Sequence, residues 1–384
     1  MRIAVLSTSP VPSTAAHSIQ MMKTAHALVQ VSDGPLRLWT PGSEATTWPR
    51  LAQQYGLIHP LDVTWVPSRP QLRRVDFVTT AINQIRQWEA DVLYTWTVQA
   101  GVAALLQHLP VILEIHDRPT GFFGKSWLRL FASLSGQKRV LLITQALRSA
   151  LETEFNICFP EDTVQIAPNG CDLEQYAGLP DATEARRRLA LPERLTALYS
   201  GHLYSGRGMD VLLALARAHP AVQFIWAGGR PEAVREWQQK IDREHLDNIY
   251  LTGFLDHQQL PLMQSTADIL LMPYARRIAG SGGGNSADIC SPMKMFDYLA
   301  AGRAIMTSDL PVLHEVLSPA CAIFCQPEDE ADWVQSFGNL VRDTALRNRL
   351  GACAQVQATK YTWQARAAQA LADFPTGDEL REAN

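Results

Sequence analysis

The chain has 384 residues, a formal net charge of -4 and 19% charged side chains, which is typical of a soluble globular protein. Its length allows two or three domains, each large enough for a core of its own. The negative net charge excludes a global attraction to nucleic acid, so we expect no nucleic-acid partner.

The six cysteines show no paired metal-ligand spacing. We therefore expect reduced cysteines, no metal site and a cytoplasmic protein. After Arg2 the apolar run is too short for a signal peptide, and no run reaches membrane-spanning length.

In the first half, short apolar runs predict strands, and helical patterns separate most of them; the first helix is marked by apolar residues between Ile19 and Val29. The predicted strands are 2–7, 36–39, 63–66, 92–95, 111–115, 140–144 and 164–167. The alternation predicts a parallel sheet covered on both faces.

The same pattern restarts after a polar, proline-bounded segment, 179–193. The second set of predicted strands is 197–200, 223–227, 249–252, 269–272, 304–307 and 322–324. A helical tail follows over 333–372. Two successive α/β halves therefore fit better than one large sheet.

In doubly wound sheets, ligands bind beyond the carboxyl ends of strands. The loop after the first strand, TSPVPSTAAH, contains no glycine, which argues strongly against a dinucleotide-binding site there. No G-x-x-x-x-G-K-[ST] motif is present either. An NAD-dependent enzyme is accordingly a disfavoured interpretation.

The loops of the second half are rich in glycine and basic residues. The first of its strands ends in GHLYSGRG, where Gly201, Gly206 and Gly208 permit close backbone approach and Arg207 precedes a helix. The next two strands also end in glycine, followed by a basic or an aromatic residue. This many such loops favour a ligand that carries phosphate.

The stretch CSPMKMFDYLAAGRAIMTSD, 290–309, predicts a helix followed by a buried strand. Ser291 suits the N-cap, Pro292 the first helical position and Gly302 the end of the helix. The amides at such a helix N-terminus can bind a phosphate.

Two charged residues lie in the first turns of this helix. Lys294 adds a cation for a phosphate, and Asp297 could accept hydrogen bonds from a pair of hydroxyls. The alternative is an ordinary capped core helix with a solvated Lys–Asp pair.

The strand 111–115 runs directly into His116 and Asp117. His116 could bind a phosphate or a sugar hydroxyl, or transfer a proton. The alternative is a histidine in a loop with no function.

A basic and aromatic stretch, 122–139, lies in a region without acidic residues between Asp117 and Glu152. It predicts either a patch that docks on anionic lipid, making the protein peripheral on the inner face of the cell membrane, or a helix with a solvated face.

The ordered motifs resemble a known family. The segments IAPNGCD, GHLYSGRGMDVLL, IYLTGFLDHQQLPLMQSTADILLMPY and SPMKMFDYLAAGRAIMTSD are similar to those of retaining glycosyltransferases of the family 4 type. The resemblance runs from the first strand to Tyr361-Thr362-Trp363 and is looser in the first half. It implies the GT-B fold, in which two Rossmann-like parallel-sheet domains face a cleft.

The resemblance implies a division into an acceptor-binding domain 1–178, a domain 179–360 for the nucleotide sugar, and a C-terminal helix 361–384 that packs back towards the first domain. It also implies roles for the residues that match the motifs. Arg207, with Gly208, binds the donor pyrophosphate, and Asp297 binds the ribose hydroxyls. Ser291 and Pro292 begin the helix that faces the phosphates.

Further roles follow from the same resemblance. Gly253 and Phe254 lie where the nucleobase rests, and His116 lies near the transferred sugar. The loop that closes over donor and acceptor contains Ser13, Thr14 and His17.

The chain departs from the family pattern at His202 and at Ile289. His202 stands where arginine is common, so Lys294 is the candidate for the second pyrophosphate cation. The first of the two motif glutamates falls on Ile289, with Asp288 out of register. The resemblance then identifies no side chain that contacts the donor sugar. Backbone groups of Gly280–Ser286 are the candidates for this contact.

The family interpretation implies transfer of a sugar from a nucleoside-diphosphate sugar to an acceptor hydroxyl, with retention and without a metal. The acceptor would be a glycan or a lipid-linked molecule, as in polysaccharide or glycolipid biosynthesis of the cell envelope. Two alternatives stay open: a GT-B sugar-nucleotide epimerase, and a non-catalytic nucleotide-sugar-binding protein. The sequence does not identify the base, the sugar or the acceptor.

Overall fold

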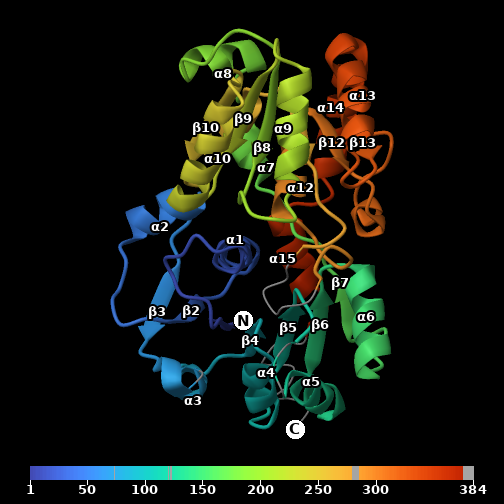
Figure 1. Cartoon of the computed structure of the whole chain (residues 1–384). Helices are drawn as coiled ribbons and strands as arrows, with labels where there is room; N and C mark the ends of the chain where they lie inside the picture. Colours follow the sequence, from blue (N-terminus) through green and yellow to red (C-terminus); the bar gives the residue numbers. More distant parts are fainter. Residues whose placement is uncertain (73, 120, 122, 279–284, 375–384) are drawn as a thin grey trace. The chain divides into compact units, whose positions relative to one another are not determined.

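A computed structural model describes residues 1–72, 74–119, 121, 123–278 and 285–374 (Figure 1). The chain divides into two compact units. The first unit comprises Met1–Asn169 together with Trp363–Asn384, and the second comprises Gly170–Thr362. The sequence had suggested divisions after residues 178 and 360.

The described part of the first unit is built on a seven-stranded parallel sheet in the order β3-β2-β1-β4-β5-β6-β7. Its strands are β1 (Ile3–Leu6), β2 (Leu36–Pro41), β3 (Asp62–Val66), β4 (Val92–Thr95), β5 (Val111–Ile115), β6 (Lys138–Leu142) and β7 (Val164–Ile166). All residues of β1, β4 and β5 are buried, as expected for strands covered on both faces.

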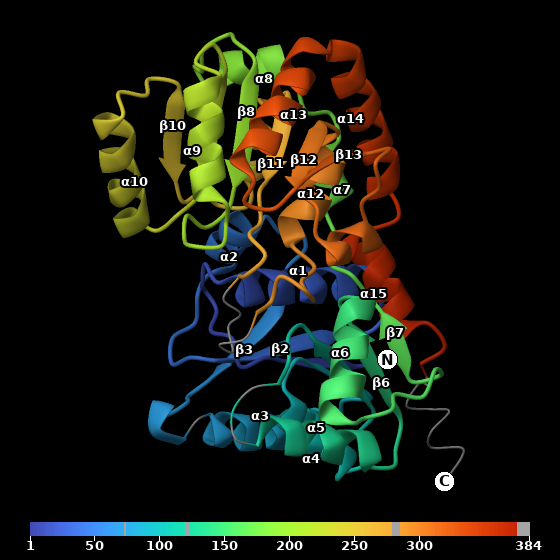
Figure 2. The same cartoon turned by 45° about the vertical axis from the view of Figure 1, so that its right-hand side comes forward.

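Helices cover this sheet on both faces. They are α1 (Ala16–Val31), α2 (Trp48–Tyr55), η1 (Pro70–Leu72), α3 (Val75–Gln87), α4 (Val98–Leu105), α5 (Gly124–Ser133), α6 (Gln145–Phe155) and α15 (Trp363–Leu371). The last helix, α15, packs beside α1, while α3, α4 and α5 lie next to one another on the other face (Figure 2).

The described part of the second unit contains a six-stranded parallel sheet in the order β10-β9-β8-β11-β12-β13. Its strands are β8 (Thr196–Ser200), β9 (Gln223–Ala227), β10 (Ile249–Gly253), β11 (Ile269–Met272), β12 (Ala304–Ser308) and β13 (Ala322–Cys325). The core on one face of this sheet includes the aromatic side chains of Trp226, Trp333 and Phe337.

The helices of the second unit are α7 (Leu173–Tyr176), α8 (Ala182–Arg188), α9 (Met209–Ala218), α10 (Pro231–Arg243), α11 (Leu260–Ser265), α12 (Met293–Ala301), η2 (Pro311–Glu315), α13 (Glu330–Arg342) and α14 (Thr344–Ala358). Helix α9 packs with α13, and α12 packs with α14. The strand order reverses between β8 and β11, which is where a doubly wound sheet opens a crevice for ligands.

The fold confirms the predicted α/β class and the position of every predicted strand, with two local corrections. Strand β6 ends at Leu142, because Thr144 serves as the N-cap of α6, where its Oγ1 accepts from the Leu147 amide at 3.0 Å. Helix α12 begins at Met293 with Pro292 in extended conformation at its N-cap. Ser291 is therefore one residue too far from the first turn to be the cap that its sequence position suggested.

Candidate functional site

The loop between β8 and α9 brings the backbone close to its neighbours at the switch point of the second sheet. Gly208 has φ 70, and a Cβ there would collide with the Pro273 carbonyl oxygen after β11. Gly201 has φ 140, and a Cβ there would lie 2.7 Å from Lys294 Nζ. Glycine at both positions lets the loops after β8 and β11 pack against α12.

Arg207 lies between two aromatic rings in this loop. Its guanidinium carbon is 4.9 Å from the ring centroid of Tyr204 and 5.1 Å from that of Tyr274. It donates to the Tyr204 hydroxyl at 2.5 Å, while its buried Nε has no hydrogen-bond partner among the described residues. The stacked rings hold the guanidinium in one orientation and leave donors for a ligand.

Lys294 lies in the same place. Its Nζ is 3.9 Å from the Tyr199 ring centroid and 5.4 Å from that of Tyr274. The buried Nζ has no hydrogen-bond partner among the described residues. Burial, and then the neighbouring charge of Arg207, hold the pKa of Lys294 well below its usual value.

The two cations form what we call the cation pair, Arg207 and Lys294. Both lie against Tyr274, and within the described part of the chain no carboxylate is paired with either cation. Buried charge of one sign without a counter-charge is unfavourable, so the pair can bind an anion, and the described residues do not supply one. A diphosphate has the charge and the acceptor oxygens to fill this role.

His202 lies beside the cation pair. Its ring is stacked on Tyr204, with centroids 5.5 Å apart and an interplanar angle of 28°. Burial, followed by the charges of Arg207, Lys294 and Arg230, lowers the pKa of His202. A neutral histidine can still donate one hydrogen bond to a phosphate, but it carries no charge, so Lys294 stays the candidate for the second cation.

Backbone hydrogen bonds join the ends of β8, β9 and β10 at the same edge. The Gly201 amide donates to Ala227 O at 2.8 Å, and the Gly228 amide donates to Gly253 O at 2.8 Å. Phe254 follows with 45% exposure, so an apolar ring is accessible at this edge. The predicted nucleobase residues thus lie along the strand ends that also carry the cation pair.

The remaining predicted donor residues lie on and before α12. Ser291 is buried, and the N-cap residue Pro292 and Asp297 are half-buried. Burial raises the pKa of Tyr176, and the Asp297 carboxylate adds to that rise, which places Asp297 near Tyr176 on α7. Ile289 is fully buried and has no polar group to offer, and residues 280–284 of the Gly280–Ser286 loop lie outside the described residues.

His116 stands at the carboxyl end of β5 in the first unit. Its Nε2 contacts Glu114 Oε1, and its ring centroid lies 6.0 Å from that of His17 at the start of α1. The imidazole is largely buried, with 11% of the side chain exposed. The structure therefore brings together two of the residues that the sequence singled out in this unit.

The other two predicted residues of this unit, Ser13 and Thr14, lie in the loop before α1. Ser13 is fixed by α2: its amide donates to the Tyr55 hydroxyl at 2.7 Å, and its carbonyl accepts from Gln54 Nε2 at 3.0 Å. Thr14 is exposed. This loop is anchored at Ser13 and leaves Thr14 exposed.

Sequence reasoning missed several residues of these two sites. The aromatic side chains around the cation pair and the partners of His116, chiefly Glu114 and Arg366, were not predicted. A signal for Glu114 was present, since a carboxylate in the apolar strand VILEI needs a buried partner. Nothing in the sequence pattern links it to Arg366, which is 252 positions away.

Cationic side chains of the basic stretch 122–139 donate hydrogen bonds to carbonyl groups at the C-termini of helices. Phe122 lies outside the described residues. Lys125 Nζ donates to Glu154 O at 2.7 Å, and Arg129 Nε donates to Phe155 O at 2.9 Å, both at the end of α6. These contacts complement the negative end of the α6 dipole. The apolar side chains of Phe123 and Leu130 are 61% and 41% exposed on the same helix region.

In the described part of the chain, no group of three or more His, Cys, Asp and Glu side chains could hold a metal ion. None of the helices there combines the length and apolar character needed to cross a bilayer.

Two family models match the chain. Residues 194–343 match the model described as Glycosyl transferases group 1, and residues 24–175 match the model described as Glycosyltransferase Family 4. The first match lies within the second unit, and nearly all of the second lies within the first unit.

Curated relatives point the same way. The chain is 24% identical over 327 residues to the phosphatidyl-myo-inositol mannosyltransferase of Mycolicibacterium smegmatis, covering 81% of this chain and 78% of that protein. It is 22% identical over 298 residues to the alpha-D-kanosaminyltransferase of Streptomyces kanamyceticus, covering 69% and 72%. The D-inositol 3-phosphate glycosyltransferase of Corynebacterium jeikeium is matched over 49% of its length, at 27% identity.

Solved structures share the fold at low identity. The Anabaena protein Alr3699/HepE in complex with UDP superimposes with a TM-score of 0.73 at 17% identity, covering 96% of this chain and 98% of that chain. WaaG, a glycosyltransferase involved in lipopolysaccharide biosynthesis, gives a TM-score of 0.69 at 14% identity, covering 97% and 99%.

Proposed function

We propose that this chain, which belongs to glycosyltransferase family 4 and has the GT-B fold, moves a sugar from a nucleoside-diphosphate sugar to an acceptor hydroxyl with retention at the anomeric carbon. The observation that carries the donor assignment is the cation pair at the switch point of the second sheet. The pair has no anionic partner among the described residues and suits a diphosphate.

The proposed chemistry breaks the bond between the anomeric carbon and the diphosphate oxygen. The acceptor hydroxyl oxygen forms the new bond on the same face of the sugar, and its proton passes to the departing diphosphate. Arg207 and Lys294 then face the charge that develops on the leaving group. The amides at the start of α12 add the positive end of a helix dipole, so in this proposal no metal is needed.

The rest of the donor follows from the same edge of the sheet. We assign the ribose hydroxyls to Asp297, whose carboxylate can accept two hydrogen bonds, and the base to Gly253 and Phe254. We assign His116, with His17 beside it, to the orientation of the transferred sugar. His116→Ala should then reduce kcat far more than donor affinity; equal losses in both would remove this role.

The acceptor is proposed to be a glycan or a lipid-linked molecule. The support is the set of relatives, among them a phosphatidyl-myo-inositol mannosyltransferase. Sugar transfer is also favoured over epimerisation or simple binding, because both family models describe glycosyltransferases.

Contact with a lipid surface is proposed for the α5 region, where Phe123 and Leu130 are exposed beside cationic side chains. Phe123→Ser with Leu130→Ser should abolish co-sedimentation with anionic vesicles at low salt, whereas Val356→Ser, at a 68% exposed position of α14, should leave it unchanged. Absence of wild-type binding to these vesicles would remove the lipid surface from the proposal. Neutralising Lys125 or Arg129 is a poorer test, because both also contact the end of α6.

The deciding experiment combines a donor screen with product analysis. UDP, GDP and ADP sugars are tested by thermal shift in EDTA, since a ligand of the native state raises its stability. The sugar that stabilises the protein is then incubated with candidate acceptors, and the anomeric configuration of the product is determined by NMR. A product of inverted configuration, or release of an epimerised nucleotide sugar, would contradict the proposal.

A further inference from the structure

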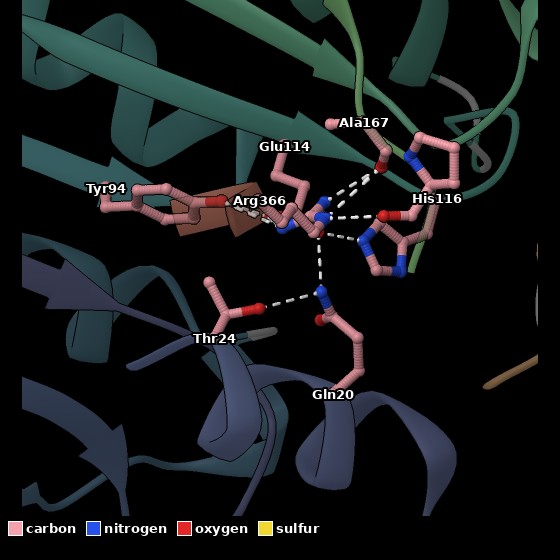
Figure 3. A network of polar contacts seen from close by, with 8 residues as sticks. Gln20, Thr24, Tyr94, Glu114, His116, Ala167 and Arg366 are labelled. Atoms are coloured by element: carbon pink, nitrogen blue, oxygen red, sulfur yellow. Dashed lines mark hydrogen bonds and ion pairs between the residues drawn. The ribbon is translucent and has the colours of Figure 1, made fainter. Parts of the chain in front are cut away.

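A carboxylate lies at the centre of a buried polar network in the first unit. Glu114, the penultimate residue of β5, is 1% exposed and accepts from Gln20 Nε2 of α1 at 2.6 Å. It also contacts the Tyr94 hydroxyl of β4 and His116 Nε2. Figure 3 shows these side chains converging on Glu114 from separate elements.

Arg366 of α15 supplies the counter-charge. Its Nη1 donates to Glu114 Oε2 at 3.0 Å, and its Nη2 lies 2.7 Å from Oε1 in the ion pair. Its Nε donates to Pro168 O at 2.9 Å, and its Nη2 donates to Ala167 O at 3.2 Å. The side chain is 5% exposed, so this is a buried, bidentate ion pair with its remaining donors satisfied.

The network determines which atom of His116 carries a proton. Burial opposes ionisation of Glu114, but the charge of Arg366 and the hydrogen bonds that the carboxylate accepts outweigh it and hold its pKa well below the usual range. An ionised carboxylate only accepts hydrogen bonds, so His116 Nε2 must be the donor in their contact. In the neutral imidazole, Nδ1 is then the acceptor, and Figure 3 shows this nitrogen turned away from Glu114.

We propose that Glu114 is a positioning residue for His116 and that Arg366 keeps it an acceptor, so that the last helix of the chain sets the tautomer of the imidazole. The expected effect on catalysis rests on the proposed role of His116 in sugar transfer. The expected effect on the tautomer does not depend on that role. The positioning role of Glu114 gives the contacts of Arg366 with β4 and β5 a function beyond stabilising the first unit.

The competing explanation is a purely structural ion pair. Such a pair would affect stability when broken and would leave the protonation of His116 unchanged. The positioning role makes a different prediction for Arg366→Met. Without the guanidinium, Glu114 either gains a proton and donates it to His116 Nε2, or pairs with a doubly protonated imidazole. In both cases Nδ1 of His116 carries a proton that it lacks in the wild type.

The test is long-range ¹H–¹⁵N NMR of the histidine side chains in the full-length protein at pH 8, without substrate. His116→Gln identifies the signal. We expect protonated Nε2 and unprotonated Nδ1 in the wild type, and protonated Nδ1 in Arg366→Met. Arg366→Lys keeps the charge, and Tyr94→Phe removes one donor and leaves the ion pair. Both should retain the wild-type tautomer.

Three results would overturn the inference: Nδ1–H in the wild type, unchanged Nδ1 in folded Arg366→Met, or a tautomer change in Arg366→Lys. If Arg366→Met does not fold, the wild-type and Arg366→Lys spectra still decide. Transfer assays give the consequence: Glu114→Gln should lower kcat by at least about tenfold, with donor affinity retained. If the tautomers are as expected but His116→Ala keeps the wild-type kcat, the proposed role of His116 is refuted. The description of the network then still holds.

Discussion

Replacing Lys294 with methionine should change donor affinity and the stability of the free protein in opposite directions. The variant removes the charge but keeps the length and the apolar stem that packs on Tyr199 and Tyr274. A hydrogen bond from a charged donor contributes about 1.5–3 kcal/mol. Loss of about 2 kcal/mol raises the Kd of the nucleoside diphosphate roughly 30-fold.

The free protein should become more stable by about 1–3 kcal/mol, because Lys294 Nζ is buried without a hydrogen-bond partner among the described residues. The destabilising effect of Lys294 on the free protein can also be measured as a function of pH. Between the lowered pKa of folded Lys294 and its ordinary value of 10.5, the unfolded chain binds a proton there that the folded protein does not. Lys294 therefore lowers stability increasingly as pH falls through this window, with a limiting slope of about 1.4 kcal/mol per pH unit.

Donor binding shows the opposite linkage. A bound diphosphate favours the ammonium form, so binding takes up a proton and affinity falls as pH rises above the pKa of Lys294 in the free protein. The measurements are urea unfolding and calorimetric titration in buffers of different ionisation enthalpy. Lys360→Met, at an exposed lysine of the same unit, is the matched control and should change neither quantity. Unchanged affinity together with lower stability in Lys294→Met would refute the reasoning.

Three further outcomes follow. Gly208→Ala should lower the free energy of urea unfolding by about 3 kcal/mol or more, because the new Cβ would collide with Pro273 O. Gly178→Ala, with the same φ of 70 and no atom within 4 Å of the new Cβ, should lower it by only about 1 kcal/mol. Similar losses in both variants would contradict the packing argument. The pKa of Glu114 is lowered in the folded state, so this carboxylate contributes stability above its unfolded pKa of about 4.5 and loses that contribution as pH falls further. Glu114→Gln should therefore reduce the loss of unfolding free energy at acid pH. An unchanged pH dependence of the unfolding free energy would contradict this expectation. Asp297→Asn should reduce calorimetric discrimination between a nucleoside diphosphate and its 2′,3′-dideoxy analogue by about tenfold, and undiminished discrimination would remove Asp297 from the ribose site.

The sequence was sufficient for the fold because its signals are local. Buried strands such as β1 and β5 are short apolar runs, and Gly302, with φ 63, ends α12 where a glycine after the last apolar residue predicts it. The same local signals failed by one residue at Ser291, where the proline belongs to the cap and not to the first turn.

The sites were predictable only in part, because their partners are distant along the chain. The loop motif identified Arg207, but its stacking on Tyr274 depends on two different strand ends meeting at one edge. Lys294 was recognised as a cation, yet its burial over Tyr199 required the packing of α12 against β8. The carboxylate of Glu114 in an apolar strand indicates a buried partner, but no sequence pattern identifies that partner as Arg366, 252 positions away.

The assignment of the donor site to the cation pair is tested by a calorimetric titration of UDP, GDP and ADP in the presence of EDTA. The titration compares the wild-type protein with a variant carrying both Arg207→Met and Lys294→Met. We predict that one diphosphate binds the wild type without metal, that its nucleoside binds much more weakly, and that the double variant does not tell the two apart. Failure of all three diphosphates to bind, or equal affinity in the wild type and the double variant, would contradict the assignment of this edge as the donor site.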